Sequence, residues 1–133
     1  MSLTEEERQA IVFYRLEKAQ QSMEDIHKVL PLRVWSIIAN RMYYALYYAA
    51  SALLIHDGHK VSTHKGVISL FNFNYVKDGP LSKEDGSLFS HIFAFRQGSD
   101  YDDFIDASEE DIKGYLPQVE ALIEKIISLI NNK

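Results

Sequence analysis

The chain has 133 residues, of which 47% are hydrophobic and 25% are charged, so a single domain over residues 1–133 can bury a substantial core. Cysteine is absent, which excludes disulfides and thiolate metal sites. The net charge of −5, without any cluster of Lys and Arg, argues against a protein that binds specific duplex DNA.

The N-terminus and the longest uncharged run both indicate where in the cell the protein is expected. The N-terminus lacks the basic start and apolar stretch of a secretion signal. The longest run without charge, 42–55, has fourteen residues, which is too few to span a bilayer. We therefore expect a cytoplasmic protein with no membrane partner.

Apolar residues recur at helical spacing in nearly every segment, which predicts an all-α protein. Thr4 and Glu7 can form a capping box at the start of a first helix over about 4–29. Pro31 fits the first turn of a second helix, because a proline there costs no hydrogen bond. This second helix is expected to end near His56.

Two further helices are predicted from their capping residues. Thr63 can cap a third helix over about 64–76. A clear break follows, and Ser82 can then open a fourth helix over about 83–97. Gly98 is expected to end this helix, since glycine is common just past a helix C-terminus.

Ser108 is expected to open the last helix, which contains a proline. Pro117 removes one hydrogen bond and crowds the preceding turn, so we expect either a kink near Gly114 or a short helix before the long one. The predicted fold is an antiparallel bundle of four long helices, with a short helix as an additional element.

Arg96 ends the apolar stripe of the fourth helix, on the same face as Phe89 and Phe93. A cation in such a place costs several kcal/mol, roughly, unless it has a partner or a role. Carboxylates and one phenol follow it at once: Asp100, Tyr101, Asp102, Asp103 and Asp106. Either Arg96 ties this acidic segment to the bundle, or it is the charged group of a phosphate site.

The second helix contains polar groups that share a narrow sector. Arg41, Tyr44 and Tyr48 are spaced three and four residues apart, so they lie on one side of the helix. One interpretation is a tightly packed aromatic seam of the core. The other is the polar wall of a site, with one guanidinium and two hydroxyls facing Arg96.

Several segments, in this order and spacing, resemble the HEPN family (higher eukaryotes and prokaryotes nucleotide-binding). They are 40–54, 63–68, 71–81 and 95–103, within a resemblance that covers about residues 10–130. The chain is similar to the small stand-alone bacterial and archaeal type. The resemblance implies a helical bundle that forms a homodimer and binds RNA or a nucleotide. It also implies pairing with a minimal nucleotidyltransferase in a toxin–antitoxin module.

Many members of this family are metal-independent RNases, with a composite site at the dimer interface. Their motif is an Arg, a polar residue, and a His four to six residues after the Arg. Arg96 and Gln97 match its first two positions, and Tyr101 stands at the His position. A phenol with a pKa near 10 is a poor base at pH 7. We therefore expect RNase activity to be weak or absent.

The position of the tyrosine that is adenylylated in some partnered family members is also different. That residue lies two positions beyond the motif His, where this chain has Asp103. The resemblance therefore leaves a phosphate-binding role for the remaining polar residues. The candidates are Arg41, Tyr44, Tyr48, Arg96, Gln97 and Asp100.

Metal binding is the weaker interpretation of the remaining histidines. His56, His59 and His64 gather with Asp57 around a turn, but no two of them share a helical turn in a defined way. His64 fits better at the start of the third helix, with ligand binding as the alternative. We predict no metal and no cofactor.

Three functional hypotheses remain from the sequence. The first is an interaction protein, one half of a module with a nucleotidyltransferase. The second is a metal-independent endoribonuclease that uses Arg96 with Tyr101. The third is a purely structural or nucleotide-sensing bundle. The tyrosine at the motif His position favours the first over the second.

Overall fold

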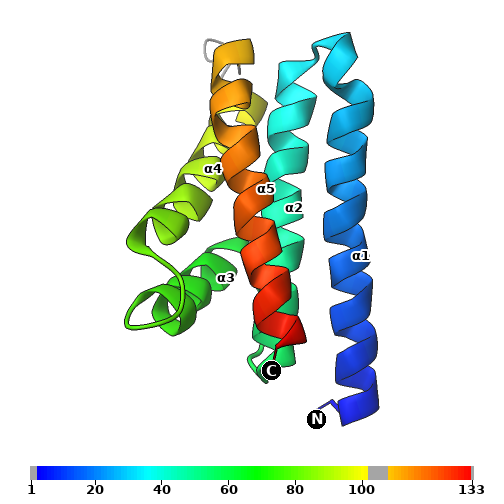
Figure 1. Cartoon of the computed structure of the whole chain (residues 1–133), viewed down its shortest axis with the longest axis vertical. Helices are drawn as coiled ribbons and strands as arrows, with labels where there is room; N and C mark the ends of the chain where they lie inside the picture. Colours follow the sequence, from blue (N-terminus) through cyan, green and yellow to red (C-terminus); the bar gives the residue numbers. More distant parts are fainter. Residues whose placement is uncertain (1–2, 102–107, 133) are drawn as a thin grey trace.

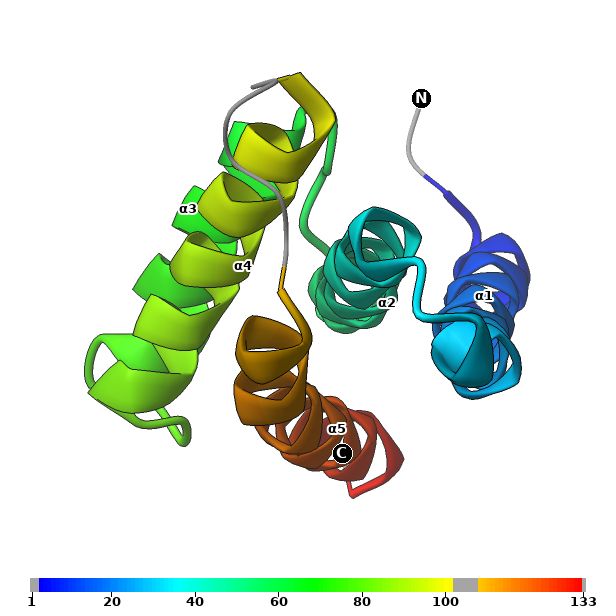
Figure 2. The same cartoon turned by 90° about the horizontal axis from the view of Figure 1, so that it is seen from above.

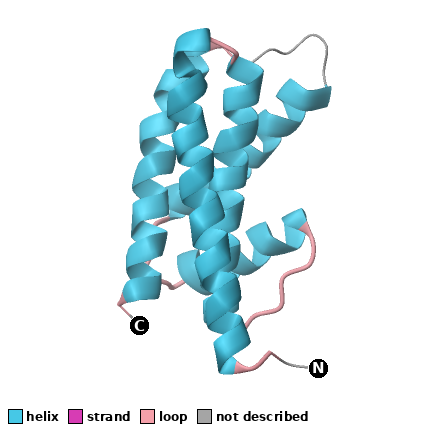
Figure 3. Ribbon diagram, turned by 90° about the vertical axis from the view of Figure 1, so that its right-hand side faces the viewer, coloured by secondary structure: helices cyan, strands magenta, loops and turns pink. Residues whose placement is uncertain are grey.

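The computed structural model describes residues 3–101 and 108–132, with the side chains of 97–101 also left out. Its elements are α1 (Glu5–Val29), a 3-10 turn (Leu30–Leu32), α2 (Trp35–His56), α3 (His64–Phe71), a π-helix (Asn72–Val76), α4 (Lys83–Tyr101) and α5 (Glu109–Asn131). No strand occurs within the described ranges (Figure 3), so the predicted all-α class is confirmed.

Consecutive long helices run in opposite directions. In Figure 1, α1, α2 and α5 lie along the long axis, while α4 crosses the others obliquely. The chain leaves α2 along α3 and the π-helix and returns along α4. The four long helices and the short α3 match the predicted antiparallel bundle. Within the described ranges, no helix combines the length and the apolar character needed to cross a bilayer.

Helix α2 occupies the centre of the bundle. It contacts α1, α3, α4 and α5, and Figure 2 shows these neighbours arranged around it. The reason lies in its sequence, because the run 42–55 has no charged residue and includes four alanines that let neighbours approach closely. Its fully buried side chains include Met42, Tyr43, Leu46, Ala49, Leu53 and Leu54.

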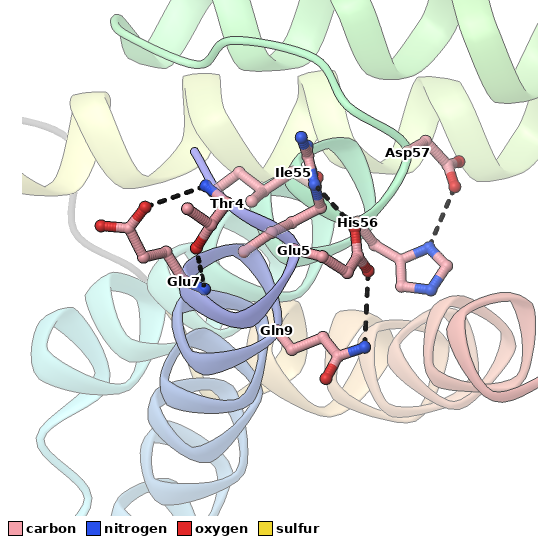
Figure 4. A network of polar contacts seen from close by, with 8 residues as sticks. Thr4, Glu5, Glu7, Gln9, Ile55, His56 and Asp57 are labelled. Atoms are coloured by element: carbon pink, nitrogen blue, oxygen red, sulfur yellow. Dashed lines mark hydrogen bonds and ion pairs between the residues drawn. The ribbon is translucent and has the colours of Figure 1, made fainter. Parts of the chain in front are cut away.

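The predicted helix starts are confirmed by their hydrogen bonds. The backbone N–H of Glu7 donates to Thr4 Oγ1 at 3.1 Å, and the Thr4 N–H donates to Glu7 Oε1 at 2.9 Å (Figure 4). Backbone N–H groups likewise donate to the side chains of Thr63, Ser82 and Ser108 at 2.9, 3.1 and 3.1 Å, respectively. Each such cap stabilises its helix by about 1 kcal/mol.

The end of α2 is connected to the start of α1. Arg8 Nη1 donates to the backbone carbonyl of Ile55 at 3.0 Å. Beside this contact, His56 Nδ1 lies 3.0 Å from Asp57 Oδ1 (Figure 4). Asp57 Oδ2 also accepts a hydrogen bond from Tyr75 Oη at 2.6 Å, which connects the π-helix to the same point. The predicted end of α2 near His56 is confirmed.

Two predicted helix boundaries were wrong. Pro31 lies in the 3-10 turn, and α2 begins four residues later at Trp35. The turn ends at Arg33, whose left-handed φ of 58° reverses the chain direction. Gly98 does not end α4, which continues to Tyr101. A glycine weakens a helix interior without preventing it.

The last five residues of the predicted third helix form a π-helix. The Lys77 N–H donates to the Asn72 carbonyl at 2.9 Å, five residues back. Side-chain amides of Asn72 and Asn74 donate to the carbonyls of Ile68 and Leu70 at 3.0 and 2.8 Å. These side chains bond to carbonyls in the turn where the backbone pattern changes.

Pro117 lies inside a continuous helix, so the alternative of a separate short helix before it was wrong. The side-chain amide of Gln118 donates to the Gly114 carbonyl at 2.8 Å, one turn before the proline. Apolar side chains on one face of α5 are buried, including Ile112, Val119, Leu122 and Ile126. Tertiary packing on both sides of the proline outweighs its cost.

Two glycines should respond in opposite ways to a methyl group. A Cβ on Gly114 would meet no atom within 4 Å, so Gly114→Ala should stabilise the protein by about 0.5–1 kcal/mol. A Cβ on Gly79 would overlap the backbone carbonyl of Tyr75, so Gly79→Ala should destabilise it by about 1–3 kcal/mol. Urea unfolding followed by circular dichroism measures both, and equal shifts would contradict this geometry.

Candidate functional site

Arg96, on α4, lies against two tyrosines of α2. Its guanidinium carbon is 5.4 Å from the Tyr44 ring centre and 5.6 Å from the Tyr43 ring centre. Arg96 Nη2 also donates to Tyr44 Oη at 3.4 Å. A cation over aromatic faces is attracted to their π electrons. The structure therefore brings together Arg96 and Tyr44, two residues that the sequence predicted to share a site.

Arg41 approaches the same ring from α2 itself. Its guanidinium carbon is 5.1 Å from the Tyr44 ring centre. Its Nε and Nη2 atoms donate to Asn40 Oδ1 at 3.2 and 2.8 Å. Two half-buried guanidinium groups thus lie beside one phenol, in a chain with a net charge of −5.

A row of aromatic rings continues from Tyr44 along α2. Tyr48 lies 6.0 Å from Tyr44 and 5.8 Å from Tyr47, measured between ring centres. Tyr44, Tyr47 and Tyr48 are all partly exposed, whereas Tyr43 is fully buried. One tyrosine of this row therefore packs in the core, and the other three border a partly open surface.

A third cation, Arg15, comes from α1. Its guanidinium carbon is 6.0 Å from the Tyr47 ring centre, and its Nη1 donates to Ser51 Oγ at 3.1 Å. The buried Ser51 in turn donates to the Tyr48 carbonyl at 3.1 Å. Sequence reasoning missed Arg15. The sequence could have indicated that Arg15 faces the bundle, because it lies between Val12 and Ala19 on the apolar stripe of the first helix.

His64 is the second residue that sequence reasoning left out of the site. It is the first residue of α3, directly after the capping Thr63. Its Nδ1 lies 2.6 Å from Tyr43 Oη, and its ring stacks on Tyr47 with 4.5 Å between ring centres and an interplanar angle of 25°. No spacing rule predicts this contact between elements, although the position at a helix start was predicted.

The surroundings of His64 favour its neutral form. Burial lowers the pKa of His64 from its ordinary value, and the positive charge of Arg96 lowers this pKa further. Burial raises the pKa of Tyr43, with Tyr47 and Tyr44 adding to the effect, so its phenol keeps its proton at neutral pH. The site therefore pairs a neutral imidazole with a permanently charged guanidinium.

Several predicted site residues cannot be compared with the structure. The backbone of Gln97, Asp100 and Tyr101 forms the last turns of α4, and their side chains lie outside the described part of the chain. The predicted pairing of Arg96 with Asp102 and its acidic neighbours falls on residues that are also outside it. Among the described residues, Arg96 contacts Tyr43 and Tyr44 of α2.

In the histidine cluster around the turn after α2, two members form hydrogen bonds within the protein. His56 is hydrogen-bonded to Asp57, which also accepts from Tyr75. His64 belongs to the tyrosine cluster instead. Across residues 3–101 and 108–132, no group of three or more His, Cys, Asp or Glu side chains is arranged to hold a metal ion.

Comparison with known proteins identifies the family of this arrangement. The sequence model of the HEPN domain matches residues 12–130. The chain belongs to the HEPN family. This HEPN domain is 32% identical over 126 residues to a "UPF0332 protein" of Thermotoga maritima, which covers 95% of this chain and 96% of the relative.

Two archaeal relatives extend the comparison. A "UPF0332 protein" of Archaeoglobus fulgidus is 28% identical over 117 residues, covering 88% of this chain and 93% of the relative. A protein of Methanocaldococcus jannaschii with the name "Putative toxin" is 26% identical over 110 residues, covering 83% of this chain and 75% of that protein. This HEPN domain is thus similar to a protein with a toxin-like name.

The charge of Arg96 should be visible in the titration of His64. We expect an NMR titration to give His64 a pKa below the ordinary value of about 6.5. Arg96→Gln should raise this pKa, because it removes a nearby positive charge. Lys18→Gln, which removes a cation that lies over Tyr14 on α1, is the control and should leave the pKa of His64 unchanged. An equal pKa in Arg96→Gln and the unaltered protein would contradict the proximity of Arg96 to His64.

The same lowered pKa has a consequence for stability. The unfolded state binds the His64 proton more tightly than the folded state does. The His64 contribution to stability is therefore complete above about pH 6.5 and decreases as the pH falls toward its folded pKa.

Proposed function

We propose that this HEPN domain binds the phosphate groups of RNA or of a nucleotide and acts as the toxin-like component of a two-component module. One observation carries the proposal. The guanidinium groups of Arg41 and Arg96 lie 5.1 and 5.4 Å from the ring centre of Tyr44, at a partly open surface. An anion that contacts both would relieve their mutual repulsion and form charge-assisted hydrogen bonds.

The neighbouring aromatic rings suit an RNA ligand in particular. Tyr44, Tyr47 and Tyr48 are partly exposed beside these cations. Unpaired bases stack on such rings while arginines contact the backbone phosphates. Gln97 and Asp100 follow Arg96 on α4 and are proposed as additional contacts to the sugar or the phosphate.

Loss of either arginine should weaken RNA binding. We expect Arg96→Ala and Arg41→Ala each to reduce the affinity for a fluorescent single-stranded oligoribonucleotide about tenfold, measured by anisotropy. Each should also reduce the salt dependence of binding, with a slope lower by about 0.7 per lost phosphate contact. Titration with ATP under the same conditions distinguishes a free nucleotide from RNA.

The matched control is Lys18→Ala, which removes a cation that lies over Tyr14 on the outer side of α1. This variant should bind RNA as tightly as the unaltered protein. If the Lys18 and Arg96 variants lost affinity equally, binding would depend on overall charge. The proposed site at Tyr44 would then be rejected.

We further propose a homodimer formed through the partly open face of α2. Ile37 is 49% exposed, and it precedes Arg41, Tyr44 and Tyr48 at helical spacing on the same side of the helix. An apolar residue beside a row of tyrosines is typical of the centre of a protein interface. A second copy bound to this face would also place its own Arg96 near the Arg96 of the first copy.

Dimerisation can be tested with a charge at the centre of this face. We expect light scattering to give the mass of a dimer for the unaltered protein and of a monomer for Ile37→Glu. Phe73→Glu is the matched control, because Phe73 is 65% exposed in the π-helix, away from this face. A monomeric unaltered protein at high concentration would exclude the homodimer.

The proposed partner in the module is a minimal nucleotidyltransferase. Support comes from the family and from the toxin-like name of the archaeal relative. A reading frame for such an enzyme beside this gene, and co-purification of the two products, would test the pairing. The alternative function is a metal-independent endoribonuclease in which Arg96 works with Tyr101 at a composite site.

A further inference from the structure

We propose that His64 is the proton-transfer residue of the Arg96 site, so that this chain cleaves single-stranded RNA without a histidine at the position of Tyr101. The proposal rests on the phosphate site proposed above and adds a reaction to it. It assigns the proton carrier to the start of α3, about thirty residues before Arg96 in the sequence.

The first argument is position, since His64 and Arg96 contact the same two phenol rings. The His64 ring centre lies 5.6 Å from that of Tyr43 and 6.0 Å from that of Tyr44. The Arg96 guanidinium carbon lies 5.6 and 5.4 Å from the same two ring centres. The two groups thus border the same pair of rings, and Arg96 is near enough for its charge to lower the pKa of His64.

The second argument is that the imidazole is held in place. Tyr47 stacks on one face of the ring, and Tyr43 Oη holds Nδ1 at 2.6 Å. When Nδ1 carries the proton, Nδ1–H donates to the phenol oxygen, and the lone pair of Nε2 is left to accept a proton from a substrate. A fixed tautomer and a fixed ring plane are what a general base requires.

The third argument is electrostatic and separates His64 from two other histidines. His27 and His56 are hydrogen-bonded to the carboxylates of Glu120 and Asp57. His64 instead lies among phenols with Arg96 nearby, and its pKa is lowered. It is therefore neutral, and able to accept a proton, at physiological pH.

The proposed reaction is transesterification within the RNA chain. Nε2 of His64 takes the proton of the ribose 2′-hydroxyl, and the 2′-oxygen attacks the adjacent phosphorus. The bond from phosphorus to the 5′-oxygen breaks, and the imidazolium returns the proton to that oxygen. The products are a 2′,3′-cyclic phosphate and a 5′-hydroxyl, without a metal or a redox step. Arg96 stabilises the charge that develops on the phosphate oxygens.

The test measures binding and cleavage separately on one probe. The probe is a fluorescent single-stranded oligoribonucleotide in EDTA, beside an identical oligonucleotide with 2′-deoxyribose at every position. We expect cleavage of the RNA alone. His64→Gln should bind RNA normally and cleave it at least about 100-fold more slowly. His91→Gln, changed at an exposed histidine of α4, is purified in parallel and should cleave normally.

Each result decides between the two proposals. RNA binding without cleavage by the unaltered protein, or normal cleavage by His64→Gln, overturns the role of His64 and leaves the phosphate site standing. Absence of RNA binding overturns the phosphate site itself. Normal binding with lost cleavage in His64→Gln, and loss of both in Arg96→Ala, supports both proposals.

Tyr43→Phe provides a second test if His64→Gln does not fold. Within the described part of the chain, the groups that face His64 are Tyr43, Tyr44 and Tyr47 of α2 and Arg96 of α4. Removing the Tyr43 hydroxyl removes the acceptor for Nδ1–H, which makes the imidazolium less stable. The acidic limb of the pH–rate profile for cleavage should therefore move to lower pH. A limb that stays in place or moves to higher pH would contradict the proposal.

Discussion

The burial of α2 is the constraint on which the rest of the structure depends. A helix with fourteen consecutive uncharged residues has to be covered by neighbours, and α1, α3, α4 and α5 all pack against it. On one face of α2, this cover is incomplete at Ile37, Arg41, Tyr44 and Tyr48. The same packing that creates the core therefore leaves a partly open edge, where α1, α3 and α4 each contribute one side chain: Arg15, His64 and Arg96.

Most of the fold could be predicted from local sequence, because its signals act over three or four residues. Thr4, Thr63, Ser82 and Ser108 each form the cap that their spacing indicated. Two of the failures concern residues that are unfavourable in a helix. Gly98 and Pro117 oppose helix formation locally, yet both helices continue through them. At Pro117, the burial of apolar side chains on both sides of the proline outweighs its local cost, and local propensity does not include this packing energy.

Only the part of the candidate site that lies on α2 could be predicted from residue spacing. Arg41, Tyr44 and Tyr48 share a helix, so their spacing alone placed them together. The contact of Arg96 with Tyr44 spans 52 residues and agreed with the family resemblance. The contact of His64 with Tyr43 spans 21 residues and depends on how α3 leaves the turn after α2. Arg15 was overlooked because a lone arginine on a first helix gives no local signal of its partner.

The π-helix at Asn72–Val76 has a consequence for how this segment tolerates change in length. Its hydrogen bond reaches five residues back, so the turn holds one residue more than an α-helical turn does. Loss of one residue there could be absorbed by conversion to α-helical bonding. Five residues of a π-turn cover about the same rotation as four residues of an α-helix, so Tyr75 would keep its direction relative to Phe71 and its contact with the carboxylate of Asp57. The connection between α3 and the end of α2 should therefore tolerate the loss of this one residue.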